Sequence, residues 1–304
     1  ALAAVLRAID LGRSPPVLNQ DEAINAWNAW CLLKTGRDMV GAHWPIFYAR
    51  AIGESRTTLY FYALLPFQWL GGINLWTTRL PAMLAGVLGV PLIAFAGARL
   101  FDRRVGLVAA LLLATNPWHL FLGRIGFEGS LCPLLALIPL VLMIAAGLPM
   151  SDREREPRPA LALLAGLAAG VACYGYWAMR LYLPAMMLVL LASFAWRGSG
   201  ATRSRRGVAT ALAMLAGFGV TFGPLAWKHV SDPLIARRAE MTRLWEAGTP
   251  LHEIARRVLE RFAVHFGGDF LFVRGDHFEI VNPLRAGAFS WFVLPLLLAG
   301  LVTL

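Results

Sequence analysis

The sequence predicts an all-α protein, a polytopic bundle of transmembrane helices. Of its 304 residues, 58% are hydrophobic and only 15% are charged, so too few charges are present to cover a water-exposed surface. Apolar runs of helical length also recur along the chain, separated by short connections that carry arginine. Both observations are typical of a protein that crosses a membrane several times.

The N-terminal part begins with an apolar stub, 1–9, followed by a polar stretch, 10–56, that carries too many charges to lie in hydrocarbon. Its tryptophans suit the headgroup level of a bilayer. The next apolar run, 59–71, is shorter than the about 20 residues that a helix needs to span the hydrocarbon core. We therefore expect an interfacial or re-entrant helix there, with a tilted short crossing as the alternative.

Seven later apolar runs are each expected to cross the membrane, although the fifth is short. Prolines inside them are tolerable, because packed neighbours satisfy the backbone carbonyls that a proline frees. The chain starts with Ala1 and ends at Leu304 inside an apolar run, so we expect a single domain, 1–304, that is a fragment of a longer chain truncated at both ends. The seven runs are 75–98, 105–122, 130–148, 160–178, 181–196, 207–227 and 287–304.

Arginine is concentrated in alternate short loops, and short loops rich in arginine remain in the cytoplasm. The net charge of +10 is therefore an orientation signal and not a nucleic-acid surface, since no basic stretch is interleaved with stacking aromatics. The opposite loops, 10–74, 123–129, 176–181 and 229–286, are expected together on the extracytoplasmic face of a cell membrane. The arginines of the cytoplasmic loops are Arg99, Arg103, Arg104, Arg153, Arg155, Arg158, Arg197, Arg203, Arg205 and Arg206.

The last of the outer loops contains a predicted amphipathic helix, 251–266. Apolar residues such as Leu251, Val258 and Phe262 recur at intervals of three and four, and charged residues take the other face. Such a helix suits the bilayer surface or a cover over a site. Ordinary packing on neighbouring loops is an equal alternative.

Two adjacent acids, Asp21 and Glu22, open a helical pattern in the first outer loop. Two interpretations fit them. An acid at a helix start accepts from free backbone N–H groups and suits the helix dipole. Alternatively, a carboxylate beside a membrane acts as a general base. Taken alone, the pattern favours the cap.

Five charged residues lie at helix ends on the same expected face. Each of them, considered singly, is an anchor at the membrane boundary. The four arginines among them, taken together, suit an anionic lipid head group, because the guanidinium group can donate two parallel hydrogen bonds to phosphate oxygens. These residues are Arg56, Arg79, Arg124, Glu128 and Arg180.

Other features narrow the functional class. The central thirds of the seven runs contain no Asp, Glu, Lys or Arg, whereas ion-coupled transporters and pumps usually place charges there. A lipid flippase with a hydrated groove at the membrane edge remains an alternative.

The three cysteines, Cys31, Cys132 and Cys173, give neither a disulfide framework nor a metal spacing, and the six histidines are scattered. No metal site is predicted.

Seven short motifs, in their order along the chain, resemble the protein O-mannosyltransferase-like branch of the GT-C glycosyltransferases, which includes bacterial aminoarabinose transferases. The resemblance covers nearly the whole chain, and the order of the motifs is more specific than any single one. One departure is that many relatives have Lys-Pro-Pro where this chain has Arg56-Thr57-Thr58, which keeps the positive charge. The motifs are Asp21–Ala23, Leu33–Asp38, Arg56–Tyr60, Thr78–Pro81, Arg99–Gly106, Gly123–Glu128 and His265–Phe272.

This resemblance implies a GT-C fold, a polyprenyl-phosphate-linked sugar as co-substrate and an active site in the first extracytoplasmic loop. It also implies inversion at the anomeric carbon, with Asp21 as the base and Glu22 beside it. Inverting transfer needs one such base. A divalent cation is an open alternative, since some GT-C enzymes use one.

The remaining charged residues receive supporting roles. The departing polyprenyl phosphate gains negative charge, which Arg56, Arg124 or Arg180 would stabilise. Glu128, together with Arg79, would orient the acceptor or hold an arginine in place.

The expected partners are the lipid bilayer, the lipid-linked sugar and a protein, lipid or glycan acceptor, with no nucleic acid. Two other classes are alternatives to this membrane glycosyltransferase. One is a flippase or transporter for lipid-linked sugars without transferase activity. The other is a non-catalytic membrane subunit that holds a partner with its outer loops.

Overall fold

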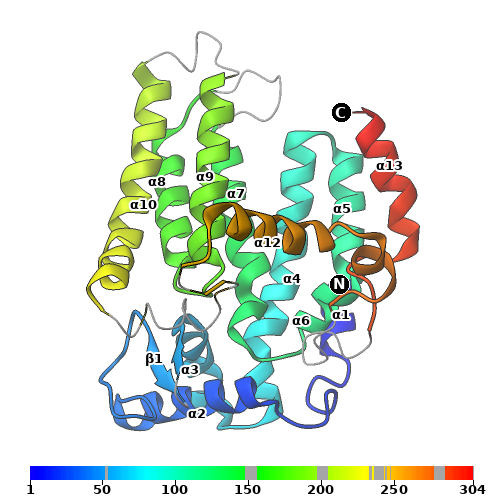
Figure 1. Ribbon diagram of the computed structural model, residues 1–304. Helices are drawn as coiled ribbons and strands as arrows, with labels where there is room; N and C mark the ends of the chain where they lie inside the picture. The colour runs from blue at the N-terminus through cyan, green and yellow to red at the C-terminus, as the bar shows by residue number, and fades with distance from the viewer. Residues whose placement is uncertain are drawn as a thin grey trace.

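The structure, a computed structural model, describes residues 1–51, 54–147, 156–196, 205–232, 235, 243, 245–246, 248–276 and 285–303. It is a helical bundle with one small hairpin (Figure 1). Upright helices form the body, and α2, α3 and the hairpin lie together at one end of it (Figure 1). The predicted all-α membrane fold is therefore confirmed.

The elements that follow one another along the chain have these bounds. In the first part they are α1 (Leu2–Ala8), α2 (Gln20–Thr35), β1 (Ala49–Ala51), β2 (Glu54–Arg56), α3 (Leu59–Gly71), α4 (Leu75–Leu100), α5 (Arg103–Thr115) and α6 (Pro117–Leu122). In the second part they are η1 (Glu128–Leu131), α7 (Cys132–Ala145), α8 (Pro159–Ala172), α9 (Met179–Trp196), α10 (Arg205–Ser231), α12 (Leu251–Val264), η2 (Asp269–Val273), η3 (Trp291–Val293) and α13 (Leu294–Thr303).

The body of the bundle is a chain of packed helices, in which α5 packs on α4, α4 on α7, α7 on α8 and α8 on α10. Small residues bring α8 and α10 into close contact. A Cβ added at Gly166 would lie 2.0 Å from the carbonyl oxygen of Met214, and one at Gly217 would lie 2.3 Å from that of Leu163. Membrane helices use small residues in this way, because lipid gives no hydrophobic drive for their association.

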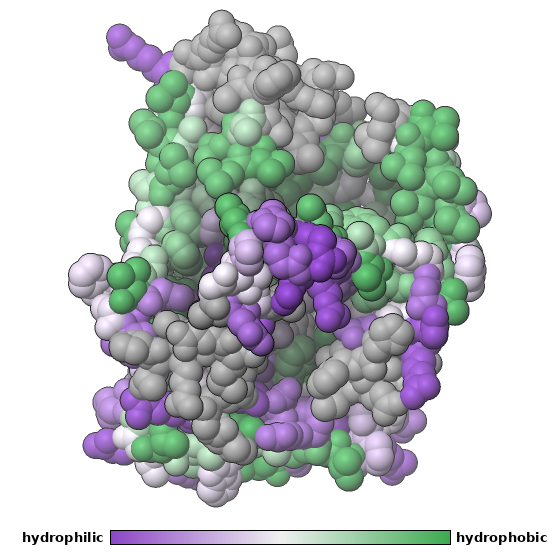
Figure 2. All heavy atoms as spheres, in the orientation of Figure 1, coloured by the Kyte–Doolittle hydropathy of each residue, from purple (hydrophilic) through white to green (hydrophobic). Residues whose placement is uncertain are grey.

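Three of the described helical stretches are long and apolar enough to cross a membrane: Leu75–Leu100, Glu128–Ala145 and Arg205–Ser231. Three further apolar helices, Pro159–Ala172, Met179–Ala192 and Trp291–Val302, are shorter. Apolar side chains gather over the upper part of the molecule, and polar ones over the end that holds α2 (Figure 2). The protein is a multi-pass membrane protein.

The predicted span 105–122 is wrong as a single helix. It divides into α5 and α6 at Asn116, whose side chain accepts from the backbone N–H of His119, with Pro117 at the first helical position. Proline has no N–H to donate to the preceding turn. With 13 residues, α5 is about 20 Å long, which is less than the roughly 30 Å hydrocarbon core.

The two helices predicted in the outer loops are present. The run predicted over 59–71 forms α3 with the same bounds, and the amphipathic pattern over 251–266 forms α12, which runs across the upright helices (Figure 1). No residue of α12 is buried, and its Leu259 and Phe262 are exposed. Within the described chain, α12 therefore does not pack as an ordinary core helix.

The hairpin of β1 and β2 was not predicted. Its strands pair antiparallel with Ala49 opposite Arg56 and Arg50 opposite Ser55. Strands of three residues are too short to show an alternating pattern in sequence. The hairpin matters because β2 carries Arg56 to the end of the bundle where α2 lies.

The turn between α4 and α5 lies at the end of the bundle opposite α2 (Figure 1), with Arg99 in the last turn of α4 and Arg103 and Arg104 at the start of α5. This placement agrees with the expected separation of arginine-rich loops from the first outer loop. Several residues used for that expectation lie outside the described part of the chain. They are Arg153, Arg155, Arg197 and Arg203.

Candidate active site

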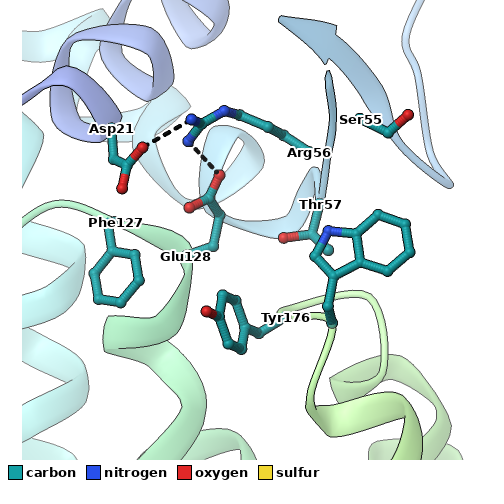
Figure 3. A pocket seen from close by; sticks show the side chains of 8 residues that line it. Asp21, Ser55, Arg56, Thr57, Phe127, Glu128 and Tyr176 are labelled. Atoms are coloured by element: carbon teal, nitrogen blue, oxygen red, sulfur yellow. Dashed lines mark hydrogen bonds and ion pairs between the residues drawn. The ribbon is translucent and has the colours of Figure 1, made fainter. Parts of the chain in front are cut away.

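A pocket opens where the start of α2, the end of β2, the start of η1 and the turn between α8 and α9 meet (Figure 3). Four segments that are distant in the sequence thus contribute to one cavity. Its lining residues are Asp21, Ser55, Arg56, Thr57, Phe127, Glu128, Tyr176 and Trp177.

Asp21 enters the pocket from the first turn of α2. That helix begins at a capping box, in which the Asn19 side chain accepts from the Glu22 backbone N–H at 2.8 Å, and the Glu22 carboxylate accepts from the Asn19 N–H at 3.1 Å. The cap is therefore supplied by Asn19 and Glu22. Asp21 is left out of it, and its side chain is 36% exposed.

Arg56 lies between two carboxylates, as Figure 3 shows. Its Nη2 is 2.8 Å from Asp21 Oδ1, and its Nη1 donates to Glu128 Oε1 at 3.4 Å. The side chains of Arg56 and Glu128 are nearly buried, at 10% and 7% exposure. The guanidinium therefore holds two acids that would otherwise repel each other, and it fixes the Asp21 carboxylate at the mouth of the pocket.

The turn between α8 and α9 completes the wall. The Thr57 hydroxyl donates to the Gly175 carbonyl at 2.9 Å, which fastens β2 to this turn. Tyr176 packs edge-on against Phe127 with ring centroids 6.1 Å apart. Burial is the main cause that raises the pKa of the Tyr176 hydroxyl, so this group stays protonated and able to donate.

Sequence reasoning did not assign Thr57, Tyr176 or Trp177 to the site. The available signal was the aromatic run in a short loop, which the sequence predicted on the same face as Asp21. Nothing in the sequence indicated that this loop meets β2.

Glu22 does not line the pocket, which corrects the expectation that both neighbouring acids share it. Its side chain is 1% exposed and forms a buried ion pair with Arg79, whose Nε donates to Oε1 at 2.8 Å. The same oxygen accepts from the Gly126 N–H at 2.8 Å. Successive helix residues point about 100° apart, so adjacent carboxylates reach different neighbours.

Arg79 Nη2 also donates to Glu22 Oε2 at 3.2 Å, and the other donors of Arg79 go to backbone carbonyls. Its Nη1 donates to the carbonyls of Leu11 and Pro15, at 3.0 and 2.8 Å, and its Nη2 donates to that of Val17 at 3.0 Å. The buried pair of Glu22 and Arg79 thus joins the N-terminal segment, α2, α4 and the chain before Glu128. The pair thereby fixes the two segments that carry Asp21 and Glu128 into the pocket.

Arg124 also lies away from the pocket, which corrects its expected place beside the donor phosphate. Its guanidinium donates to the carbonyls of Leu6 and Arg7, both at 3.4 Å, and to that of Ser14 at 3.1 Å. These contacts hold the N-terminal segment against the 123–127 loop.

Arg180 lies behind one wall of the pocket. Its guanidinium stacks on Trp177, 3.9 Å from the ring centroid, and contacts His229 Nε2 at 3.0 Å. Its Nε donates to the Cys173 carbonyl at 3.2 Å, and its buried Nη2 has no hydrogen-bond partner among the described residues. The positive charge therefore sits one aromatic ring away from the cavity.

Within the described part of the chain, no three His, Cys, Asp or Glu side chains group closely enough to hold a metal ion. The three cysteines are free.

The fold and the pocket define a class: a multi-pass membrane protein whose bundle carries, at one end, an arginine held between two acids. Residues 55–222 match the profile of the dolichyl-phosphate-mannose-protein mannosyltransferases, and the chain belongs to this family. The resemblance to the mannosyltransferase-like branch of the GT-C glycosyltransferases is confirmed. No curated protein matches the chain.

The fold is similar to two solved structures of ArnT from Cupriavidus metallidurans. With the apo form the TM-score is 0.57 at 18% sequence identity, over 81% of this chain and 43% of that chain. With the form bound to undecaprenyl phosphate the TM-score is 0.57 at 20% identity, over 77% of this chain and 41% of that chain. The sequence therefore spans about two fifths of the length of these proteins.

Proposed function

We propose that this protein is an inverting membrane glycosyltransferase, which moves a sugar from a polyprenyl-phosphate donor to a hydroxyl of an acceptor on the extracytoplasmic face. Family membership supports transfer from a lipid-linked sugar. The similarity to an ArnT structure bound to undecaprenyl phosphate supports a polyprenyl-phosphate partner. The observation that carries the proposal is the bridge of Arg56 between Asp21 and Glu128 inside the pocket.

In this mechanism Asp21 is the base. It accepts the proton of the acceptor hydroxyl while that oxygen forms a bond to the anomeric carbon. The bond between the anomeric carbon and the phosphate oxygen breaks on the opposite face, and its electron pair leaves with the polyprenyl phosphate. The exposure of Asp21, in contrast to Glu22, supports this assignment.

The leaving phosphate requires positive charge. Arg56 is its first partner, but Asp21 and Glu128 already balance the guanidinium charge. A second cation is therefore needed to stabilise the leaving phosphate. Arg180 fits this role, because it stacks on the pocket residue Trp177 and its Nη2 has no hydrogen-bond partner among the described residues. Glu128 keeps Arg56 in place, and Arg79 acts through Glu22 on the position of α2.

The decisive experiment uses the full-length protein in proteoliposomes with a polyprenyl-phosphate sugar and measures the released polyprenyl phosphate. Asp21→Asn should reduce release by at least about 10³-fold, since the base is removed while shape is kept. Asp102→Asn is the matched control, because Asp102 caps α5 at the other end of the bundle and asparagine also caps helices. Wild-type release by Asp21→Asn would remove Asp21 from the mechanism.

The same vesicles separate the alternative functions. A flippase would move the sugar lipid across the bilayer without any acceptor and without releasing polyprenyl phosphate. A non-catalytic subunit would release none unless a partner protein is added. Mass spectrometry of membranes supplied with defined polyprenyl-phosphate sugars then identifies the acceptor.

A further inference from the structure

A second cavity, of about 450 Å³, lies in the first outer loop beyond the end of α2. This volume falls within the roughly 300–1,000 Å³ of small-molecule sites. Its wall carries one acid, one base and two aromatic rings, a mixture that recognises a ligand by a few directed polar contacts. The lining residues that matter here are Asp38, Pro45, Ile46, Phe47, Tyr48 and Arg50.

Asp38 is the distinctive group of this cavity. It is 4% exposed, and its Oδ1 accepts from the backbone N–H groups of Val40 at 3.1 Å and Ala42 at 2.7 Å. Its Oδ2 is buried and has no hydrogen-bond partner among the described residues. A buried carboxylate oxygen without a donor is costly, and its presence calls for a partner that the described residues do not supply.

The other walls are held by hydrogen bonds to neighbouring elements. The Pro45 carbonyl accepts from the Tyr62 hydroxyl at 2.8 Å, and the Ile46 carbonyl accepts from the Thr58 hydroxyl at 2.5 Å. The Tyr48 hydroxyl donates to Asp232 Oδ2 at 2.8 Å, which joins the loop to the chain after α10. The cavity is therefore preformed, as a binding site is expected to be.

The lining carries one negative and one positive side chain, so it does not favour a ligand with a single charge. Asp38 disfavours a phosphate, and Arg50 disfavours an ammonium group, since like charges repel. A neutral polyhydroxyl ring suits both, because a hydroxyl donates to the Asp38 carboxylate and another accepts from the Arg50 guanidinium. Phe47 and Tyr48 offer apolar faces for the carbon side of such a ring.

This cavity is structurally joined to the candidate active site. Arg50 of β1 is paired in register with Ser55 of β2, which lines the pocket of Asp21. Phe47 packs on Tyr174, with ring centroids 6.1 Å apart, two residues before the pocket residue Tyr176. The β1–β2 hairpin therefore connects a residue of one cavity to a residue of the other, and the Phe47–Tyr174 contact is a second connection.

We propose that the cavity lined by Asp38, Phe47, Tyr48 and Arg50 is a sugar-binding subsite that holds a ring of a glycan acceptor next to the active site. The acceptor role rests on the proposed transferase function. Sugar binding itself does not, so the two ideas are tested separately.

Binding is tested by saturation-transfer NMR on the full-length protein in nanodiscs, with methyl glycosides of mannose, glucose, galactose and arabinose as probes. We expect at least one probe to bind wild type, and to bind Asp38→Asn at least about 10-fold more weakly. Asparagine keeps the acceptor for Val40 and Ala42 and replaces the unpartnered oxygen with an N–H donor. Absence of binding to wild type, or equal binding to Asp38→Asn, would overturn the sugar subsite.

Two further variants test whether Asp38→Asn weakens binding only by disturbing the fold. Arg50→Gln changes another lining residue, whose side chain is exposed, and should also weaken probe binding. Asp102→Asn, another aspartate that accepts from two backbone N–H groups, should leave binding unchanged. Loss of binding in Asp102→Asn or its persistence in both cavity variants would contradict the assignment.

Steady-state kinetics then show whether the cavity binds the acceptor or the donor sugar. If transfer is observed, Asp38→Asn should raise the KM for a glycan acceptor at least about 10-fold and leave the donor KM unchanged. A change confined to the donor KM would contradict the acceptor role and assign the cavity to the donor sugar. Probe binding without any transferase activity would contradict the proposed function and would still support the sugar subsite.

Discussion

Asp21 and Glu22 are adjacent in sequence, but their carboxylates lie in different surroundings. Asp21 is 36% exposed and shares Arg56 with Glu128, whereas Glu22 is 1% exposed and faces Arg79. An exposed acid at a pocket mouth can exchange protons with a substrate. A fully buried one that accepts four hydrogen bonds has no free position for this and acts on structure.

A first prediction concerns stability. Glu22→Gln removes one partner of a buried pair and leaves Arg79 as an uncompensated buried charge, so it should destabilise the protein by about 3–5 kcal/mol. Thermal unfolding of the purified protein in detergent measures the effect. Asp21→Asn, at the next position, should melt close to wild type, and equal losses in both variants would contradict the division of roles.

A second prediction concerns the arginine bridge. Arg56→Lys keeps the charge but replaces a planar fork by a single ammonium, which cannot hold Asp21 and Glu128 in the same geometry. We expect kcat to fall by roughly 10²-fold, the usual cost of one lost charge-stabilising donor. Arg37→Lys is the control, because Arg37 is exposed and its guanidinium donates to the Gly41 carbonyl. A wild-type kcat for Arg56→Lys would show that charge alone suffices.

At the scale of elements, the close contact of α8 with α10 gives a third prediction. Gly166→Ala places a Cβ 2.0 Å from the backbone oxygen of Met214, so the two helices must separate. The melting temperature should fall, because packing is what holds membrane helices together. Gly219→Ala on α10 meets nothing within 4 Å and should be neutral or stabilising, by up to about 1 kcal/mol. A lower melting temperature for Gly219→Ala than for Gly166→Ala would show that this contact is not tight.

The helices were predictable because their signals are local. The bounds of α3 follow from an apolar run that ends at Gly71-Gly72, and those of α12 from apolar residues at intervals of three and four. The sequence also contains the signal that divides 105–122, although the prediction missed it, since Asn116 is a helix cap and Pro117 follows at the first helical position. The β1–β2 hairpin was not, because three-residue strands depend on pairing and not on local pattern.

At the scale of the whole molecule, a fourth prediction tests orientation. The end with α2 should face outside the cell and the turn between α4 and α5 should face the cytoplasm, since arginine-rich short loops stay inside. In a background with the three cysteines replaced by alanine, Lys34→Cys should react with a membrane-impermeant maleimide in intact cells. Arg104→Cys, equally exposed, should react only after permeabilisation. The reverse pattern would place the candidate active site in the cytoplasm.

The sequence by itself determined the membrane class and most of the helices, and it predicted that Asp21, Arg56 and Glu128 lie on one face. Hydrophobicity, arginine placement and alternation of crossings are properties of the chain, so they need no coordinates. Only the tertiary structure decided which charges touch. It separated Asp21 from Glu22, moved Arg124 to the N-terminal segment, placed Arg180 behind Trp177 and revealed the Asp38 cavity. Contacts such as these, between residues 57 and 104 positions apart, depend on how helices rotate and pack, and no local pattern records that rotation.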